Sequence, residues 1–309
     1  MPNASLGNPP RWLVIVALVA IQILFGVGYV VSKIVVEAFT PLVWASLRII
    51  ISTGLMFAAV KILRRPHPKA DRHFFLPLVG FALLGIIINQ ASFLVGLRYT
   101  TSTNSAILNT LIPVFTLLIV TVRGQEPATF LRIVGFLLSF TGVLVLRKVE
   151  NLSLSDQTFI GDLLTVLNCF SYGLFLSYGK KFLEKYDRIW TTVWLFAYGS
   201  VGLTLIAIPD YMNFQMPVMT PLLFGCVVFA VVGTTLLTYF LNNWTLAYTK
   251  SSNVALFIYI QPVVASGIAY FFKGEVITLR TVLSCGLIFI GVVTVLMSKE
   301  RVQKKAVAI

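Results

Sequence analysis

A fifty-residue segment occurs twice in this chain, and the duplication restricts the possible folds more than any other feature of the sequence. Residues 97–146 align without a gap with residues 246–295, and 15 of the 50 aligned pairs are identical. The identical pairs include Tyr99 with Tyr248, Asn104 with Asn253, Pro113 with Pro262 and Glu126 with Glu275. Internal self-similarity is the signature of a repeated structural unit. The sequence therefore predicts two related halves.

The composition predicts that both halves lie in a membrane. The chain is 58% hydrophobic and only 11% charged, whereas a soluble domain has about 25% charged residues. Its apolar runs have about the 20 residues that a helix needs to cross a bilayer, and lipid forces such runs to be helical. We expect an all-α polytopic membrane protein of ten transmembrane helices, at 12–33, 41–62, 74–97, 102–122, 128–146, 159–179, 190–209, 219–241, 252–272 and 278–298.

Five helices per half is an odd number, so the second half is expected to enter the membrane upside down relative to the first. We predict a first repeat at 12–146, a linker at 147–158, a second repeat at 159–298 and a basic cytoplasmic tail at 299–309. With both termini in the cytoplasm, 17 basic residues lie inside and 6 outside, which fits the positive-inside rule. Inverted repeats are a recurring architecture of secondary transporters, which bind substrate between the halves.

Other classes of function are disfavoured by the residues present. The basic residues lie in loops between spans, which is a membrane pattern and not one of nucleic-acid binding. Cys169, Cys226 and Cys285 are dispersed in spans, and His67 and His73 share one loop. We expect no catalytic residue, metal site or cofactor. The expected partners are the lipid bilayer and a small-molecule substrate, with the protein a monomer or a homodimer in the plasma or inner membrane.

Arg48 is the one charge well inside a predicted span. Intramembrane charges are costly and usually face a cavity or a partner. Arg48 is interpreted as a contact for a substrate carboxylate, with a structural bond to helix-end carbonyls as the alternative. The other candidate substrate-binding residues are polar or aromatic side chains at mid-span: Gln22, Asn89, Gln90, Asn109, Asn168, Tyr172, Tyr239, Tyr259 and Gln261. Singly, each could also serve as a bond between helices.

Several repeated features have local structural interpretations. Pro113 and Pro262 are predicted to kink two helices at matching positions, either at a substrate site or for packing only. Lys33 and Lys180 are expected to snorkel towards the membrane surface. Glu126 and Glu275 are expected to cap the helices that follow them. Three pairs of small residues at four-residue spacing are predicted to allow close helix packing: Gly54 with Ala58, Gly135 with Ser139, and Ala265 with Ala269.

These motifs, taken in order, resemble the EamA-type family of the drug/metabolite transporter superfamily. In the first half the resemblance rests on Phe25-Gly26, Lys33, Pro41, Arg48, Gly96-Leu97, Tyr99-Thr100, Asn104-Ser105-Ala106, Pro113, Gly135 and Gly142-Val143. In the second half it rests on Gly161-Asp162, Leu164, Ala247-Tyr248-Thr249, Asn253-Val254-Ala255, Gln261-Pro262, Gly274-Glu275 and Gly291-Val292. The resemblance implies a ten-helix bundle of inverted repeats that moves small metabolites, often amino acids, usually outward. This family commonly has Trp where this chain has Phe25.

The sequence thus predicts a transporter that exports or exchanges small metabolites by alternating access, with amino acids as the expected substrates. No Asp, Glu or His lies at mid-span, and proton-coupled transporters usually place such a group there. We therefore expect a facilitator or an exchanger. The alternatives are a channel, a receptor or scaffold on the same fold that does not transport, and a membrane enzyme, for which no nucleophile or base is evident.

Overall fold

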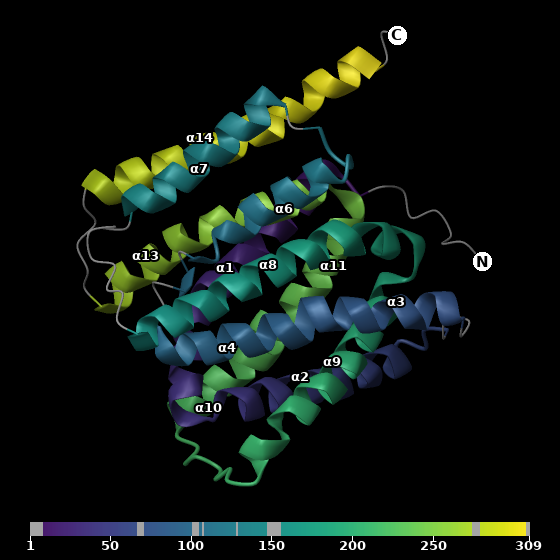
Figure 1. Cartoon of the computed structure of the whole chain (residues 1–309), viewed down its shortest axis with the longest axis vertical. Coiled ribbons are helices and arrows are strands. Elements are labelled where there is room, and N and C mark those ends of the chain that lie inside the picture. Colours follow the sequence, from purple (N-terminus) through teal and green to yellow (C-terminus); the bar gives the residue numbers. More distant parts are fainter. Residues whose placement is uncertain are drawn as a thin grey trace.

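The computed structural model describes residues 9–66, 71–100, 105–106, 108–127, 129–146, 156–273 and 279–306. Within these ranges every regular element is a helix (Figure 1). The elements are α1 (Arg11–Ala38), α2 (Pro41–Ile62), α3 (Arg72–Ala82), η1 (Leu83–Ile88), α4 (Asn89–Tyr99), α6 (Leu111–Val122), α7 (Phe130–Leu146), α8 (Asp156–Lys185), α9 (Arg188–Tyr211), α10 (Pro221–Val228), η3 (Phe229–Leu237), α11 (Thr238–Tyr248), α12 (Ser251–Leu256), η4 (Phe257–Tyr259), α13 (Ile260–Lys273) and α14 (Leu279–Ala306).

Six continuous helical stretches among the described residues are long and apolar enough to cross a membrane. They are Arg11–Ala38, Pro41–Ile62, Arg72–Tyr99, Phe159–Lys185, Arg188–Tyr211 and Pro221–Tyr248. Shorter apolar helices cover Leu111–Val122, Phe130–Gly142, Ser251–Val264 and Val282–Val295. The protein is therefore an all-helical, multi-pass membrane protein. The stretch ending at Tyr248 runs past the end predicted at residue 241, because Asn242 and Asn243 are polar but buried inside the bundle.

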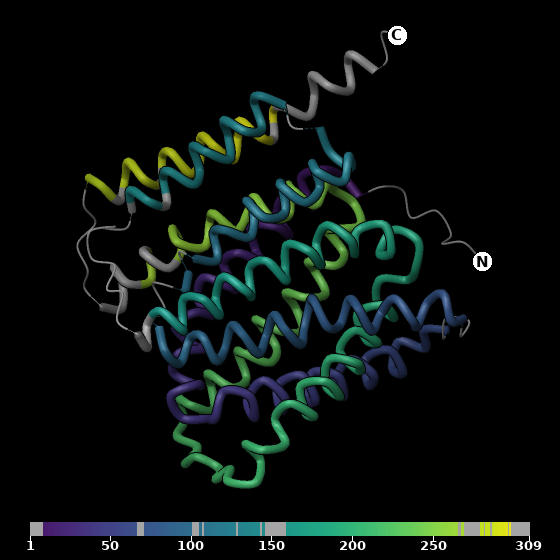
Figure 2. The backbone as a smooth tube through the Cα atoms, in the orientation of Figure 1, coloured from purple at the N-terminus to yellow at the C-terminus, as the bar shows by residue number. Residues whose placement is uncertain are grey.

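The helices form a bundle with a paired flank. In Figure 1, α7 and α14 lie side by side along one flank, while α2, α9 and α10 lie on the opposite side. The helices α1, α6, α8, α11 and α13 lie between them, and Figure 2 shows α4 running beside α8. Residues from both halves of the sequence therefore meet in the middle of the bundle.

Glycine allows the close approach of α7 and α14. A Cβ atom on Gly135 would lie 2.7 Å from the carbonyl oxygen of Gly291, and one on Gly291 would lie 2.2 Å from the Ser139 hydroxyl. The predicted packing role of Gly135 and Ser139 therefore agrees with the structure. The prediction for Gly54 and Ala58 is wrong within this chain, because a Cβ on Gly54 would meet no atom within 4 Å and Ala58 is exposed. The side chains of Ala265 and Ala269 lie outside the described part of the structure.

Two helices are interrupted at matching positions, just before the two prolines that are predicted to kink them. The first break is a turn at Asn109 and Thr110 before α6, and the second is the 3₁₀ turn η4 before α13. Pro113 and Pro262 each lie in the first turn of the helix that follows the break. Proline is tolerated there because its missing N–H would have had no intrahelical acceptor. The backbone N–H of Ile112 donates to the Asn109 carbonyl at 3.0 Å, which satisfies that group.

A second irregularity also occurs once in each half. The π-helical segment η1 interrupts the α3–α4 stretch, and η3 interrupts the α10–α11 stretch. Each directly precedes polar residues at mid-helix, which are Asn89 and Gln90 in the first half and Thr238 and Tyr239 in the second. π-Helical turns inside α-helices occur frequently at functional sites.

Lys33 and Lys180 do not snorkel as predicted but bind the C-terminal ends of helices. Lys33 Nζ donates to the carbonyls of Leu97 at 2.9 Å and Thr100 at 3.1 Å. Lys180 Nζ donates to those of Leu246 at 3.3 Å and Thr249 at 2.7 Å. The final carbonyls of a helix carry partial negative charge and lack intrahelical donors. Each lysine therefore stabilises the end of α4 or α11.

Candidate functional site

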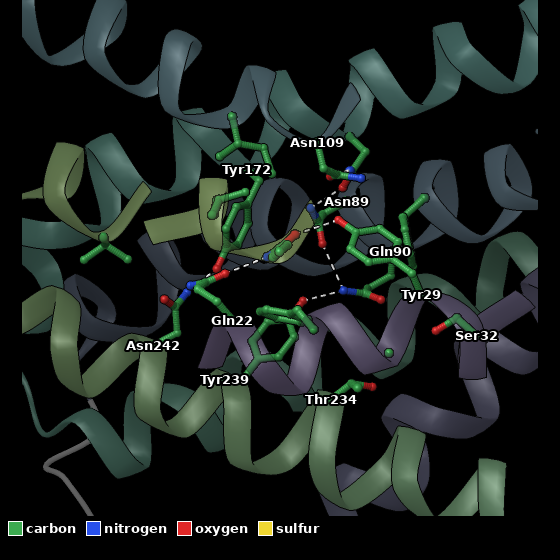
Figure 3. A pocket seen from close by; sticks show the side chains of 18 of the residues that line it. Gln22, Tyr29, Ser32, Asn89, Gln90, Asn109, Tyr172, Thr234, Tyr239 and Asn242 are labelled. Carbon is green, nitrogen blue, oxygen red and sulfur yellow. Dashed lines mark hydrogen bonds between the residues drawn. The ribbon is translucent and has the colours of Figure 1, made fainter. Parts of the chain in front are cut away.

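A polar cavity of about 80 Å³ lies inside the bundle, between elements of both halves of the chain (Figure 3). Because one water needs about 10–15 Å³ on the same scale, the cavity has room for several waters or a small ligand. The lining residues are Gln22, Phe25, Gly28, Tyr29, Ser32, Arg48, Asn89, Gln90, Phe93, Asn109, Ile112, Asn168, Tyr172, Thr234, Tyr239, Asn242, Val254, Ile258 and Gln261.

Nine of the ten residues predicted to bind substrate line this cavity, and Tyr259 does not. Val254, Ile258 and Gln261 are spaced by four and three residues, so they share one face of the helix and reach the cavity together. Tyr259 follows Ile258 in the 3₁₀ turn η4, so its side chain points about 120° away from that of Ile258. It packs instead with Phe136, and its hydroxyl has no hydrogen-bond partner among the described residues. The assignment of Tyr259 to the cavity wall is therefore wrong.

A chain of side-chain hydrogen bonds crosses the cavity wall from Arg48 to the Ser105 carbonyl. Arg48 Nη2 donates to Gln90 Oε1, and Gln90 Nε2 donates to Asn89 Oδ1 at 2.9 Å. Asn89 Nδ2 donates to Asn168 Oδ1 at 2.5 Å, and Asn168 Nδ2 donates to Asn109 Oδ1 at 2.7 Å. Asn109 Nδ2 ends the chain by donating to the Ser105 carbonyl at 2.8 Å.

The two ends of this chain fix the direction of every bond in it. Arg48 can only donate, so Gln90 must present its oxygen to the guanidinium. The Ser105 carbonyl can only accept, so Asn109 must present its nitrogen there. Each amide between them accepts on one side and donates on the other. Bonds aligned in one direction polarise one another, which stiffens the wall.

A second set of bonds joins the first helix to the ninth predicted span. The Tyr29 hydroxyl donates to Gln261 Oε1 at 2.8 Å, and Gln261 Nε2 donates to Gln22 Oε1 at 2.6 Å. Asn242 Nδ2 donates to the Tyr172 hydroxyl, also within the cavity wall (Figure 3). These polar groups are therefore held in place before any ligand arrives.

Arg48 is buried, with 3% of its surface exposed, and it faces this cavity. Its hydrogen bond goes to a side-chain amide and not to helix-end carbonyls. Its Nε atom has no hydrogen-bond partner in the described part of the chain, where no carboxylate lies within ion-pair distance of its guanidinium. A buried charge without a counter-charge is costly, so this arrangement favours an anion in the cavity.

Sequence reasoning missed several lining residues, chiefly Tyr29, Ser32, Thr234 and Asn242. Asn242 lies just beyond the span end predicted at residue 241, although it is three residues after Tyr239 and hence on the same helix face. Tyr29 lies seven residues after Gln22, which again gives the same face. The helical spacing could have identified both residues.

A buried ion pair lies outside this cavity, where only a helix cap was predicted. Arg132 Nη2 donates to Glu126 Oε2 at 2.6 Å and to the Ser252 hydroxyl at 2.7 Å. Both charged side chains are 5% exposed. The backbone N–H of Ser252 donates to Glu126 Oε1 at 3.4 Å, so Glu126 caps α12 of the other half. Among the described residues its carboxylate accepts no backbone N–H of α7, the helix that follows it. Glu275, its counterpart in the repeat, lies outside the described residues.

The described residues include no group of three His, Cys, Asp or Glu side chains that could hold a metal. What the cavity offers is a charge, amides, hydroxyls and aromatic faces in a confined space. Such a site can recognise a small polar molecule.

Comparison with known proteins identifies the family. The model of the EamA-like transporter family matches residues 12–148 and again residues 159–297. This chain belongs to the EamA-like transporter family. The two matches follow the two halves in which the segment 97–146 and its copy occur.

Relatives of this EamA-family protein are described as transporters without an assigned substrate. An uncharacterised transporter of Archaeoglobus fulgidus is 28% identical over 261 residues, which is 84% of this chain and 89% of the relative. The uncharacterised inner membrane transporter YedA of Escherichia coli is 25% identical, over 92% of this chain and 90% of the relative. A solved crystal structure has a TM-score of 0.74 at 13% identity, covering 94% of this chain and 97% of that one, which supports the fold alone.

Proposed function

We propose that this protein is a secondary transporter that exports or exchanges a small metabolite bearing a carboxylate group, by alternating access of the central cavity. Ten spans in two inverted five-helix halves, with both termini in the cytoplasm, are the architecture proposed with it. Amino acids are the first substrate class to test. The observation that carries the proposal is Arg48, which is buried in a polar cavity of a transporter-family protein and has no carboxylate partner among the described residues.

The hydrogen bonds across the cavity join the two halves, and they are the contacts through which substrate binding would be coupled to a movement of one half against the other. Tyr29 to Gln261, Asn89 to Asn168 and Gln90 to Tyr239 each join a residue before 147 to one after 158. Each such bond contributes only about 1 kcal/mol net. A substrate that replaces some of them lowers the cost of separating the two halves, and so couples its own binding to the movement.

In this mechanism Arg48 attracts the carboxylate, and the amides orient it. Phe25, Phe93 and Ile258 provide apolar surface for the rest of the molecule. Closure of one end before the other opens would be the step that prevents a leak. The paired helix breaks before α6 and α13 support this location of the site, because interrupted helices at matching positions mark the binding sites of many transporters.

The experiment is counterflow in proteoliposomes. Vesicles are preloaded with mixed amino acids, or with mixed small organic acids, and entry of each labelled compound is followed with and without a pH gradient. Saturable counterflow that is indifferent to the gradient and is lost in Arg48→Ala is the expected result. Lys61→Ala, which removes an exposed charge, is the control and should transport normally.

Other outcomes would change the assignment. Dependence on the pH gradient would overturn the expected facilitator or exchanger mechanism. Flux that rises linearly with concentration and shows no counterflow would indicate a channel. Ligand binding without any flux would indicate a receptor or scaffold built on the same fold.

A further inference from the structure

We infer that the cavity selects carboxylates that lack an ammonium group over the amino acids with the same carbon skeleton. This inference rests on the proposed function, and it narrows the substrate class to small organic acids. Three observations carry it: the formal charge of the cavity, the hydrogen bonds that its amide oxygens already accept, and the donors that remain without a partner.

The formal charge of the lining is +1. Arg48 is the only charged side chain among the lining residues, and the rest are amides, hydroxyls, aromatic rings and aliphatic groups. A monocarboxylate neutralises this charge. A zwitterionic amino acid leaves the net charge at +1 and places its ammonium group near the guanidinium, in a setting where charges are poorly screened.

Most amide oxygens of the wall already accept a hydrogen bond. Seven amide side chains line the cavity, and six of their oxygens are engaged, in Gln22, Asn89, Gln90, Asn109, Asn168 and Gln261. In the series of side-chain hydrogen bonds that runs from Arg48 to the Ser105 carbonyl, these two end groups fix the direction of every bond. Flipping one amide to offer an oxygen to an ammonium group would therefore break the bonds on both sides of it.

The donors that remain in the cavity include a charged one, whereas the remaining acceptors are neutral oxygens. Arg48 Nε has no hydrogen-bond partner among the described residues. Each Asn amide in the series of hydrogen bonds donates one of its two N–H groups to the next member of the series. A carboxylate has two oxygens with about four acceptor positions, and its bonds to Arg48 join opposite charges. An ammonium group has three donors and no acceptor, and the lining offers it neutral oxygens but no opposite charge.

Binding to the purified full-length protein in detergent at pH 7.5 tests this inference by isothermal titration calorimetry. The probes are pairs that differ only in the amine: propanoate and alanine, 3-methylbutanoate and valine, and 3-phenylpropanoate and phenylalanine. The neutral amide of each acid is the third member of the set. We expect the acid to bind at least about tenfold tighter than its amino acid in one or more pairs, and the neutral amide to bind weakly.

Arg48→Gln should bring the acid and its neutral amide to similar affinity, whereas Arg48→Lys should keep the preference for the acid. The comparison among wild-type ligands stands even if a variant fails to fold. Amino acids that bind as tightly as their acids would overturn the inference and leave carboxylate transport intact. Absence of binding by both members of every pair would overturn the inference, and absence of counterflow for both classes would separately refute the proposed function.

Discussion

Replacing Glu126 by Gln should destabilise the protein far more than the same change at an exposed ion pair. In the wild type, Glu126 accepts from Arg132 at 2.6 Å and from the Ser252 hydroxyl at 2.5 Å, with both charged side chains 5% exposed. Glutamine keeps the shape but removes the charge, so Arg132 is left buried without a counter-charge. Breaking a buried pair in this way costs about 3–5 kcal/mol.

Glu184→Gln is the matched control. Glu184 pairs with Lys180 at the same distance of 2.6 Å, but its side chain is 45% exposed. An exposed pair four residues apart in a helix contributes only about 0.3–0.5 kcal/mol. The same substitution is thus made at a buried and at an exposed ion pair, and the expected contrast is about tenfold in free energy.

Unfolding in mixed detergent micelles, followed by circular dichroism, measures the free energy of each variant. The double substitution Glu126→Leu with Arg132→Met removes both charges and should recover most of the lost stability, because no buried charge is then left alone. Equal, small effects of Glu126→Gln and Glu184→Gln would refute the reasoning. So would a double variant as unstable as the sum of its single changes.

Three further predictions follow from the packing and the hydrogen bonds, each checked by the same unfolding assay. Gly135→Ala should cost about 1–3 kcal/mol by overpacking, since its Cβ would lie 2.7 Å from a carbonyl of α14. Gly54→Ala should be neutral or stabilise by up to about 1 kcal/mol, because its Cβ would meet no atom within 4 Å and alanine favours the helix; similar effects of the two changes would contradict the close packing of α7 and α14. Lys33→Met should cost about 1 kcal/mol, because two carbonyls at the end of α4 lose a charged donor, and an unchanged stability would argue against this cap. Asn168→Leu should cost about 1–3 kcal/mol, because it leaves the buried amides of Asn89 and Asn109 without their hydrogen-bond partner. A neutral or stabilising result would show that these hydrogen bonds do not stabilise the bundle.

Periodicity and hydropathy were sufficient for the helical class and for most helix positions. A helix in lipid satisfies its backbone internally, so each apolar run specifies its own structure without reference to the rest of the chain. That is why the stretch predicted at 41–62 agrees with α2 at both ends. The predicted helix end at residue 241 is wrong because Asn242 is polar but buried inside the bundle. Hydropathy depends on composition alone and does not report which residues a side chain contacts.

The location of the polar cavity was also largely readable from the sequence. Amides at lipid depth must find hydrogen-bond partners, and those of Gln22, Asn89 and Asn168 find them in one another or in Gln261 across the two halves. The requirement that they be satisfied predicts a shared interior. It does not predict which amide meets which, because that depends on how the helices cross.

The sequence alone determined the duplication, the helical membrane class and the set of polar mid-span side chains that must be buried in the interior of the bundle. Only the tertiary structure decided the partners. It turned Tyr259 away from the cavity, it brought Glu126 to Arg132 and Ser252 as a buried pair, and it directed Lys33 to the end of a helix. The physical reason is that burial and hydrogen bonding between distant residues arise from the packing of whole helices, whereas helix formation in lipid is a local property of each apolar run.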